Sequence, residues 1–127
     1  GKGLRWKAHE LPAGDPAPRG AHHSLAVADF DKDGDPDIFP VEMEGIPGVR
    51  PPRWFIWENV DGKGANFVEH VILNNALGGH EAVVADVDGD GDLDICSKLW
   101  RPRKDNANGG RNHADFMENL LGKKPAP

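Results

Sequence analysis

Two nine-residue acidic stretches constrain this chain more than any other feature. They are Asp29–Asp37 and Asp86–Asp94, and both have the spacing D-x-D-x-D-G-D-x-D. Five carboxylates this close together repel one another, so the pattern makes little sense without a cation that neutralises them. Oxygen ligands at alternating positions, with a glycine at the turn, are what Ca²⁺ requires of a loop. The sequence therefore predicts two calcium-binding loops, against the simpler reading of two solvated acidic turns.

The segments around the two acidic stretches also recur. Strands are expected at Leu4–Leu11, His22–Phe30, Ile38–Met43 and Trp54–Val60, and again at Phe67–Ile72, Gly78–Asp86, Ile95–Trp100 and Ala114–Leu120. In this match His9 stands in the place of His70, and the Glu-Asn pair at Glu58 recurs at Glu118. No stretch has a sustained helical period. The chain is thus predicted to be a tandem repeat of a strand unit.

A repeated four-stranded unit without helices is typical of β-propeller blades. We therefore expect an all-β chain of two four-stranded propeller-type blades, each with its calcium loop between its first two strands. The first repeat, an outer strand plus the first blade, is placed at residues 1–63. The second repeat, at residues 64–127, contains a blade that lacks its own fourth strand. An eight-stranded β-sandwich produced by gene duplication is the alternative.

With these motifs in hand, the chain resembles the FG-GAP or VCBS-type repeat family, the calcium-loop blades of integrin alpha-subunit propellers and many secreted bacterial proteins. The matching stretches are Leu25–Ile38 and Ala82–Ile95, together with the two Glu-Asn strands. By this resemblance the first ion is bound by Asp29, Asp31, Asp33 and Asp37 with the carbonyl of Asp35, and the second by Asp86, Asp88, Asp90 and Asp94 with the carbonyl of Asp92. An EF-hand is excluded, because it requires a glutamate at loop position 12, where this chain has Pro40 and Ser97.

Composition narrows the class of protein and its compartment. The net charge is −6, but ten of the 21 acidic residues lie in the two loops, which leaves eleven acidic against fifteen basic residues elsewhere. No basic block with interleaved aromatic residues predicts a nucleic-acid partner, and no run approaches the roughly 20 apolar residues of a membrane span. The single cysteine, Cys96, predicts a small buried residue rather than a disulfide. Because weak calcium loops fill at millimolar calcium, an extracellular, secreted or cell-surface location is expected.

The phase of the strands suggests a partner. Leu4–Leu11 corresponds to the outermost strand of a blade, and Ala114–Leu120 belongs to a blade that lacks such a strand. Two blades do not close a ring, so we expect Leu4–Leu11 to dock beside Ala114–Leu120 of a neighbouring copy, which builds a ring or a filament. The alternative is that the chain is part of a longer propeller.

Other residues leave alternatives open. His23 and His80 are candidates for a pore-lining metal site or for a repeated structural hydrogen bond. Trp54, Trp57 and Trp100 suit either sugar stacking or packing between blades. No Ser/His/Asp arrangement stands at a recognisable spacing, so no enzyme is expected. The sequence favours a structural or adhesion module, with a carbohydrate-binding or substrate-positioning segment of a larger secreted enzyme or lectin as the alternative.

Overall fold

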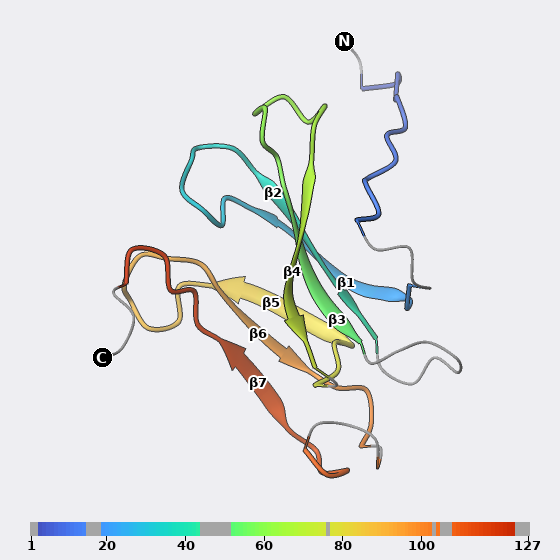
Figure 1. The fold of residues 1–127 in the computed structure, drawn as a ribbon, viewed down its shortest axis with the longest axis vertical. Coiled ribbons are helices and arrows are strands. Elements are labelled where there is room, and N and C mark those ends of the chain that lie inside the picture. Colours follow the sequence, from blue (N-terminus) through green and yellow to red (C-terminus); the bar gives the residue numbers. More distant parts are fainter. Residues whose placement is uncertain are drawn as a thin grey trace.

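The computed structural model describes residues 3–14, 19–43, 52–75, 77–102, 104 and 108–123. Within these residues all regular structure is β, with seven strands and no helix (Figure 1). The strands are β1 (His22–Ala28), β2 (Asp37–Glu42), β3 (Arg53–Glu58), β4 (Val68–Asn74), β5 (Glu81–Ala85), β6 (Asp94–Lys98) and β7 (Ala114–Met117). The expected all-β class is confirmed. The described part of the chain also holds no helix with the length and apolar character that a membrane crossing needs.

The strands form two antiparallel sheets in chain order. The first sheet has the order β1-β2-β3-β4, and the second sheet has the order β5-β6-β7. The two sheets lie one against the other, with the first sheet above the second in Figure 1. Each acidic loop joins the first two strands of its sheet, as the sequence predicts. The boundary predicted between residues 63 and 64 is a boundary of the sequence repeat, since β4 pairs with β3 and so belongs to the first sheet.

The strand predicted at Leu4–Leu11 is wrong for the chain as it stands. Residues 4–10 have no regular secondary structure and are exposed, with Leu4 80% and Trp6 92% accessible. Their alternating pattern suits a strand, but a strand needs a neighbouring backbone for its N–H and C=O groups. In Figure 1 this segment runs beside the first sheet, well away from β7. No described strand therefore lies on the free edge of β7.

Two smaller expectations also change. A proline within a strand, such as Pro40, is typical of a bulge or an edge strand, but β2 lies inside the first sheet, where Pro40 pairs with Leu25 of β1. Between β2 and β3 the paired residues are Ile38 with Trp57 and Val41 with Trp54. The ladder is interrupted between these pairs because proline has no N–H to donate. The strand predicted at Ala114–Leu120 ends earlier, at Met117, because the next residues turn back toward the acidic loop.

The core lies between the two sheets. Its buried members are Phe30, Phe39, Val41 and Trp54 from the first repeat and Ile95 from the second. Around them pack half-buried residues from both sheets, which are Ala26, Ala28, Ile56, Ile72, Leu73, Ala82, Val84, Leu93 and Met117. Phe39 makes edge-to-face contacts with the rings of Phe30 and Trp54. Burial of these side chains is what holds the two repeats together.

The two sheets do not present equivalent faces to this core. We call the face of the first sheet that carries Phe39 its front face. The front face of the second sheet is the one that carries Cys96, the repeat counterpart of Phe39, and the opposite face of each sheet is its back face. By repeat position Phe39 corresponds to Cys96, yet the core residue of β6 is the adjacent Ile95. The same shift holds on the first strand of each sheet. Ala26 of β1 packs against the core and corresponds to Val83 of β5, yet the residue of β5 that packs against the core is the adjacent Val84. The front face of the first sheet therefore packs on the back face of the second.

Polar contacts join the sheets at β1 and β5. Ser24 Oγ accepts a hydrogen bond from Ala82 N (2.9 Å) and donates one to Ala82 O (3.2 Å). The rings of His23 and His80 stack with centroids 3.9 Å apart, and His23 Nδ1 lies 2.6 Å from the carbonyl oxygen of His80. For His23, this contact matches the structural hydrogen bond rather than the metal site. The ring of His80 also contacts the ring of Trp100, with centroids 4.5 Å apart.

The loop before β5 requires a glycine at position 79. A Cβ on Gly79 would lie 1.9 Å from Val41 Cγ2 and 2.9 Å from the carbonyl oxygen of Glu42. We predict that Gly79→Ala destabilises the protein by about 1–3 kcal/mol, because overpacking here pushes the two sheets apart. Urea unfolding followed by circular dichroism measures the loss. Gly14→Ala is the control, since its Cβ would come no closer than 3.3 Å to its neighbour, the side chain of Glu69. An equal loss in both variants would contradict the explanation.

Candidate metal centres

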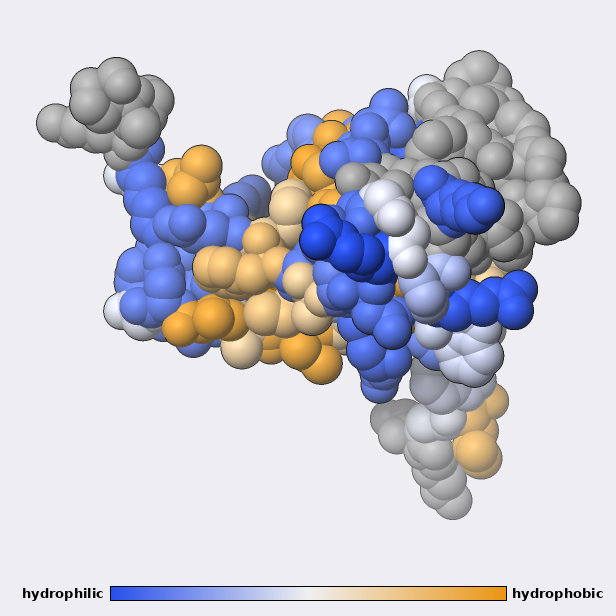
Figure 2. Space-filling model, turned by 90° about the horizontal axis from the view of Figure 1, so that it is seen from below, coloured by the Kyte–Doolittle hydropathy of each residue, from blue (hydrophilic) through white to orange (hydrophobic). Residues whose placement is uncertain are grey.

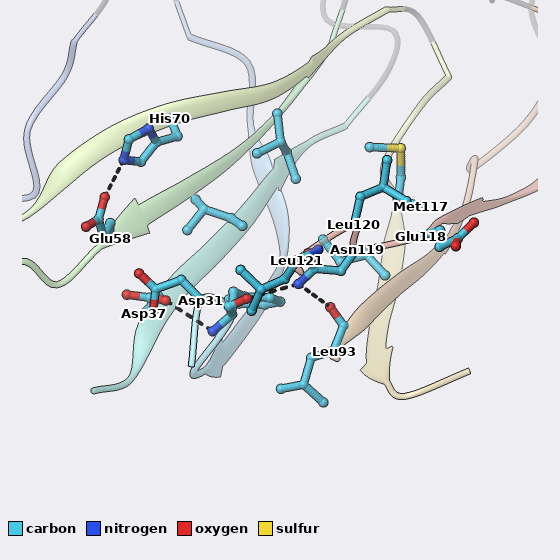
Figure 3. A pocket seen from close by; sticks show the side chains of 14 residues that line it. Asp31, Asp37, Glu58, His70, Leu93, Met117, Glu118, Asn119, Leu120 and Leu121 are labelled. Carbon is cyan, nitrogen blue, oxygen red and sulfur yellow. Dashed lines mark hydrogen bonds and ion pairs between the residues drawn. The ribbon is translucent and has the colours of Figure 1, made fainter. Parts of the chain in front are cut away.

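Each acidic loop gathers three of its five carboxylates into a cluster. Ligand oxygens of Asp29, Asp31 and Asp37 lie within 4.8 Å of one another, and Figure 3 shows Asp31 and Asp37 side by side. The second loop repeats the arrangement with the residues at the same three positions, which are Asp86, Asp88 and Asp94. Among the described residues these two clusters can hold a metal ion. The other predicted ligands, Asp33, Asp35, Asp90 and Asp92, stand outside the clusters.

The loops are shaped by hydrogen bonds from their own backbone. Gly34 N donates to Asp29 Oδ2 (3.1 Å), and Gly91 N donates to Asp86 Oδ2 (3.0 Å). These N–H groups turn the chain around the first aspartate of each loop. The sixth loop position is in the left-handed region, with φ of 99° at Gly34 and 90° at Gly91, which is why glycine stands there in both copies.

The last aspartate of the first loop ties the loop to the sheet. Asp37 is buried, and its two oxygens accept hydrogen bonds from Phe30 N (3.2 Å) and Asn59 N (2.9 Å). Phe30 lies at the start of the loop, whereas Asn59 follows β3. A single carboxylate thus connects the acidic loop with the end of the third strand.

The second loop repeats this connection. Asp94 accepts from Val87 N (2.9 Å) and Asn119 N (2.8 Å), and these two donors, Asn119 first, hold the pKa of Asp94 below its ordinary value. The Asn119 amide also donates to the carbonyl of Phe30 (2.9 Å), which links it to the first loop. Sequence reasoning recognised the shared Glu-Asn pair as a repeat signal but missed this role. The recurrence of asparagine shortly after two equivalent strands, at Asn59 and Asn119, was the available signal.

The donor set fits a hard divalent cation. All ligand atoms are carboxylate oxygens, the type that Ca²⁺ and Mg²⁺ prefer. Asp29 Oδ1 is buried, yet it has no hydrogen-bond partner among the described residues, so one lone pair beside the cluster is unused. Burial, followed by the negative charges of neighbouring carboxylates, raises the pKa of Asp31 against the lowering effect of the Asp33 N–H. A bound cation relieves both conditions.

Two lysines partly neutralise the loops. Lys32 of the first loop makes an ion pair with Asp92 of the second loop, so the loops are neighbours in space. Lys123 Nζ lies 2.9 Å from Asp88 Oδ2, 2.5 Å from Asp90 Oδ2 and 2.5 Å from Glu118 Oε1. These contacts raise the pKa of Lys123, with Asp90 as the largest cause. Neither contact was predicted from the sequence, because Lys32 stands at a variable position of the first loop and Lys123 in the turn after β7, and neither position implies a partner in the second loop.

A cleft of about 410 Å³ opens between the sheets next to the first loop. Its walls are apolar residues of both sheets, among them Ile56, Ile72 and Met117, and Asp31 and Asp37 stand at one end. Figure 3 shows the pair formed by His70 and Glu58 on its wall, with Nε2 and Oε2 2.6 Å apart. The cleft thus lies between outer strands and beside a candidate metal centre.

One comparison with known proteins bears on these loops. Residues 48–97 match the family model of the FG-GAP-like repeat. The expected resemblance to the FG-GAP repeat family is confirmed. The FG-GAP-like repeat covers β3, β4, β5 and the whole second acidic loop, and it ends within β6. The first loop lies outside this match and is related to it by the internal repeat. No curated protein and no solved structure matches the chain.

Proposed function

We propose that this chain is an extracellular, calcium-stabilised module of two propeller-type blades, with a role in structure or adhesion rather than catalysis. The packing of front face on back face carries this proposal. Successive propeller blades stack in the same sense, whereas two sheets related by a two-fold axis pack equivalent faces together. The FG-GAP-like repeat and the chain-ordered strands of both sheets support the same reading over the β-sandwich.

Calcium is the proposed ligand of both loops. The three clustered aspartates of each loop would hold the ion, and its two positive charges would offset the repulsion between them. The remaining loop aspartates and the carbonyls of Asp35 and Asp92 complete the proposed set. Open loops of this kind suit the millimolar calcium found outside cells, which supports an extracellular location.

Lys123 is expected to compete with calcium at the second loop. Its ammonium group contacts two of the aspartates there. Lys63 takes the equivalent turn position of the first repeat and makes no ion pair with the residues that the structure describes. We predict that Lys123→Gln binds calcium more tightly at the second loop and leaves the first loop unchanged. Isothermal titration calorimetry separates the two sites, and Lys63→Gln is the matched control. A second-loop affinity that does not rise would contradict the competition.

The proposed assembly uses the free edge of β7. In the first sheet Glu58 of β3 pairs with Val68 of β4 and contacts His70. By repeat position, Leu4–Leu11 of a neighbouring copy would bring Lys7 opposite Glu118 and His9 beside it. Opposite charges facing across strands favour this register over a shift by one residue. The exposed residues 4–10, which have no regular secondary structure here, would then pair with a neighbouring strand.

Sedimentation velocity over a range of protein concentrations in calcium tests the assembly. We expect wild type to form larger species as concentration rises, and the double variant Ala8→Pro, His9→Pro to remain monomeric. Two adjacent prolines remove an N–H whichever way the strand faces. The control Ala8→Ser, His9→Ser keeps both N–H groups and should still assemble. A wild-type protein that stays a monomer throughout would overturn the assembly.

The alternative function is a carbohydrate-binding or substrate-positioning segment of a larger secreted enzyme or lectin. Trp54 is fully buried and Trp57 is 6% exposed, so both serve packing. Of these three tryptophans, Trp100 is 60% exposed beside His80 and is the one whose ring a sugar can reach. Glycan-array binding by a monomer, abolished in Trp100→Ala, would favour this alternative.

A further inference from the structure

Four large apolar side chains lie exposed on the two outer faces of the stacked sheets. On the front face of the second sheet, Val83 is 62% and Phe116 48% exposed. On the back face of the first sheet, Leu25 is 65% and Val27 61% exposed. Figure 2 shows that hydrophobic residues also gather in a band bordered by hydrophilic ones on the side viewed there. Side chains of this size in matched rows mark an interaction surface.

Each of these residues has a repeat counterpart inside the protein. Val83 corresponds to Ala26 and Phe116 to Ile56, and between them Cys96 corresponds to Phe39, which is fully buried. These three counterparts form the front face of the first sheet, which packs on the second sheet.

The same holds for the opposite surface. Leu25 corresponds to Ala82 and Val27 to Val84, and both counterparts pack in the core between the sheets. The exposed residues of the two outer surfaces are therefore counterparts of residues in the internal interface. On the back face of the first sheet the exposed part is β1, because Phe55 and Trp57 of β3 are covered by His22 and Arg19.

We propose that the front face of the second sheet binds the back face of the first sheet in a second copy of this chain. This inference rests on the proposed assembly and names the surface through which it occurs. The contact repeats the internal packing, with Val83, Cys96 and Phe116 of one copy against Leu25 and Val27 of the next. A heterologous contact of this kind leaves one free surface at each end and so continues from copy to copy.

The charges and shape of the front face suit such a contact. Its charged pair, Lys98 and Glu81, is internally neutralised, with Nζ and Oε2 2.8 Å apart. Beside this pair lies a hollow of about 230 Å³ lined by residues of β5 and β6, including Val83 and Cys96. A neutral, hollowed and apolar surface accepts the exposed Leu25 and Val27 without burying an unpaired charge.

Sedimentation velocity of charge variants in calcium tests this surface. Phe116→Glu on the front face and Leu25→Glu on the back face should each weaken self-association by about tenfold or more, since central apolar anchors dominate such interfaces. Val60→Glu is the matched control, because Val60 is 48% exposed in the turn after β3 and outside both faces; it should assemble like wild type. Circular dichroism confirms that each variant is folded.

Mixing the two face variants gives the sharpest outcome. Phe116→Glu keeps an intact back face and Leu25→Glu keeps an intact front face, so the mixture should form a one-to-one complex and nothing larger. A second measurement needs no mutation. In wild type, the reaction of the Cys96 thiol with maleimide should slow as the protein concentration rises, because assembly covers the front face on which Cys96 lies. A mixture that stays monomeric, or a Cys96 rate independent of assembly, would overturn the surface.

The proposed function can fail separately. If wild type is monomeric at every concentration, the assembly itself is wrong and this surface falls with it. If wild type assembles and the double proline variant does not, but both glutamate variants assemble normally, strand docking stands and only the packing surface is wrong.

Discussion

Replacing Glu42 by alanine is expected to destabilise the protein by about 3–5 kcal/mol, because it leaves a buried arginine without its counter-charge. Glu42 is fully buried and Arg53 is 1% exposed. The Arg53 Nη2 lies 2.9 Å from Glu42 Oε1, and its Nε lies 3.1 Å from Oε2. The backbone N–H groups of Gly20 and Arg53 donate to the same carboxylate. Urea unfolding measured by circular dichroism gives the loss.

A double variant separates the buried charge from the packing. Glu42→Leu together with Arg53→Met removes both charges and should recover much of the stability lost in Glu42→Ala, because an apolar pair needs no compensation in the interior. Glu81→Ala is the surface control, since its ion pair with Lys98 is solvated and worth little. A loss in Glu42→Ala no larger than in this control would contradict the account.

The same pair gives a dependence of stability on pH. Burial raises the pKa of Glu42, but hydrogen bonds from Arg53 and Gly20 outweigh it and hold the pKa below its ordinary value of 4.5. A carboxylate whose pKa is lower in the folded than in the unfolded state contributes its full stabilisation of the fold at pH values above its unfolded pKa. We therefore expect this contribution to be lost as the pH falls below 4.5 through the lowered value. The free energy of unfolding of Glu42→Gln, measured over the same range, should show a smaller loss.

Asp37→Ala is expected to have the second largest effect, a loss of about 2–5 kcal/mol, because two buried N–H donors lose their acceptor. Those donors, Phe30 and Asn59, belong to the loop and to the end of β3. The loss should appear in chelator as well as in calcium, since these hydrogen bonds do not depend on the ion. In calcium it should be larger, because a ligand of the proposed site is removed too.

Asp33→Ala is the control for Asp37→Ala. Asp33 is exposed, and among the described residues its carboxylate accepts a hydrogen bond from Asp35 N alone (2.9 Å), so its removal should matter little in chelator. In calcium it should weaken ion binding if Asp33 is a ligand. Equal losses for both variants in chelator would mean that Asp37 does not clamp the loop to the sheet.

The repeated, local features of this fold were predictable from the sequence. The acidic loops, the alternation around them and the shared Glu-Asn pair placed seven of the eight expected strands, because each signal occurs twice at matching positions. The strand at Leu4–Leu11 failed because pattern shows what a segment can form and not whether a backbone partner lies beside it. The clusters around Asp37 and Asp94 follow from loop spacing alone.

Contacts between the repeats were not predictable from the sequence. Nothing in the pattern distinguishes Phe39, which is buried, from its counterpart Cys96, because only the stacking of the sheets decides which face is covered. The buried pair of Glu42 and Arg53 has no counterpart in the second repeat, where Leu99 takes the place of Glu42. Such unrepeated contacts carry no sequence signal of their own.

The most direct test of the central proposal is thermal unfolding with calcium and with chelator. If both loops bind calcium, free calcium at 100 times the dissociation constant should add about 2.7 kcal/mol per site, and raise the melting temperature by about 10 °C or more in total. Calorimetric titration should then give two ions per chain, reduced to one in Asp29→Ala or Asp86→Ala. An unchanged melting temperature and no heat of binding would contradict the account.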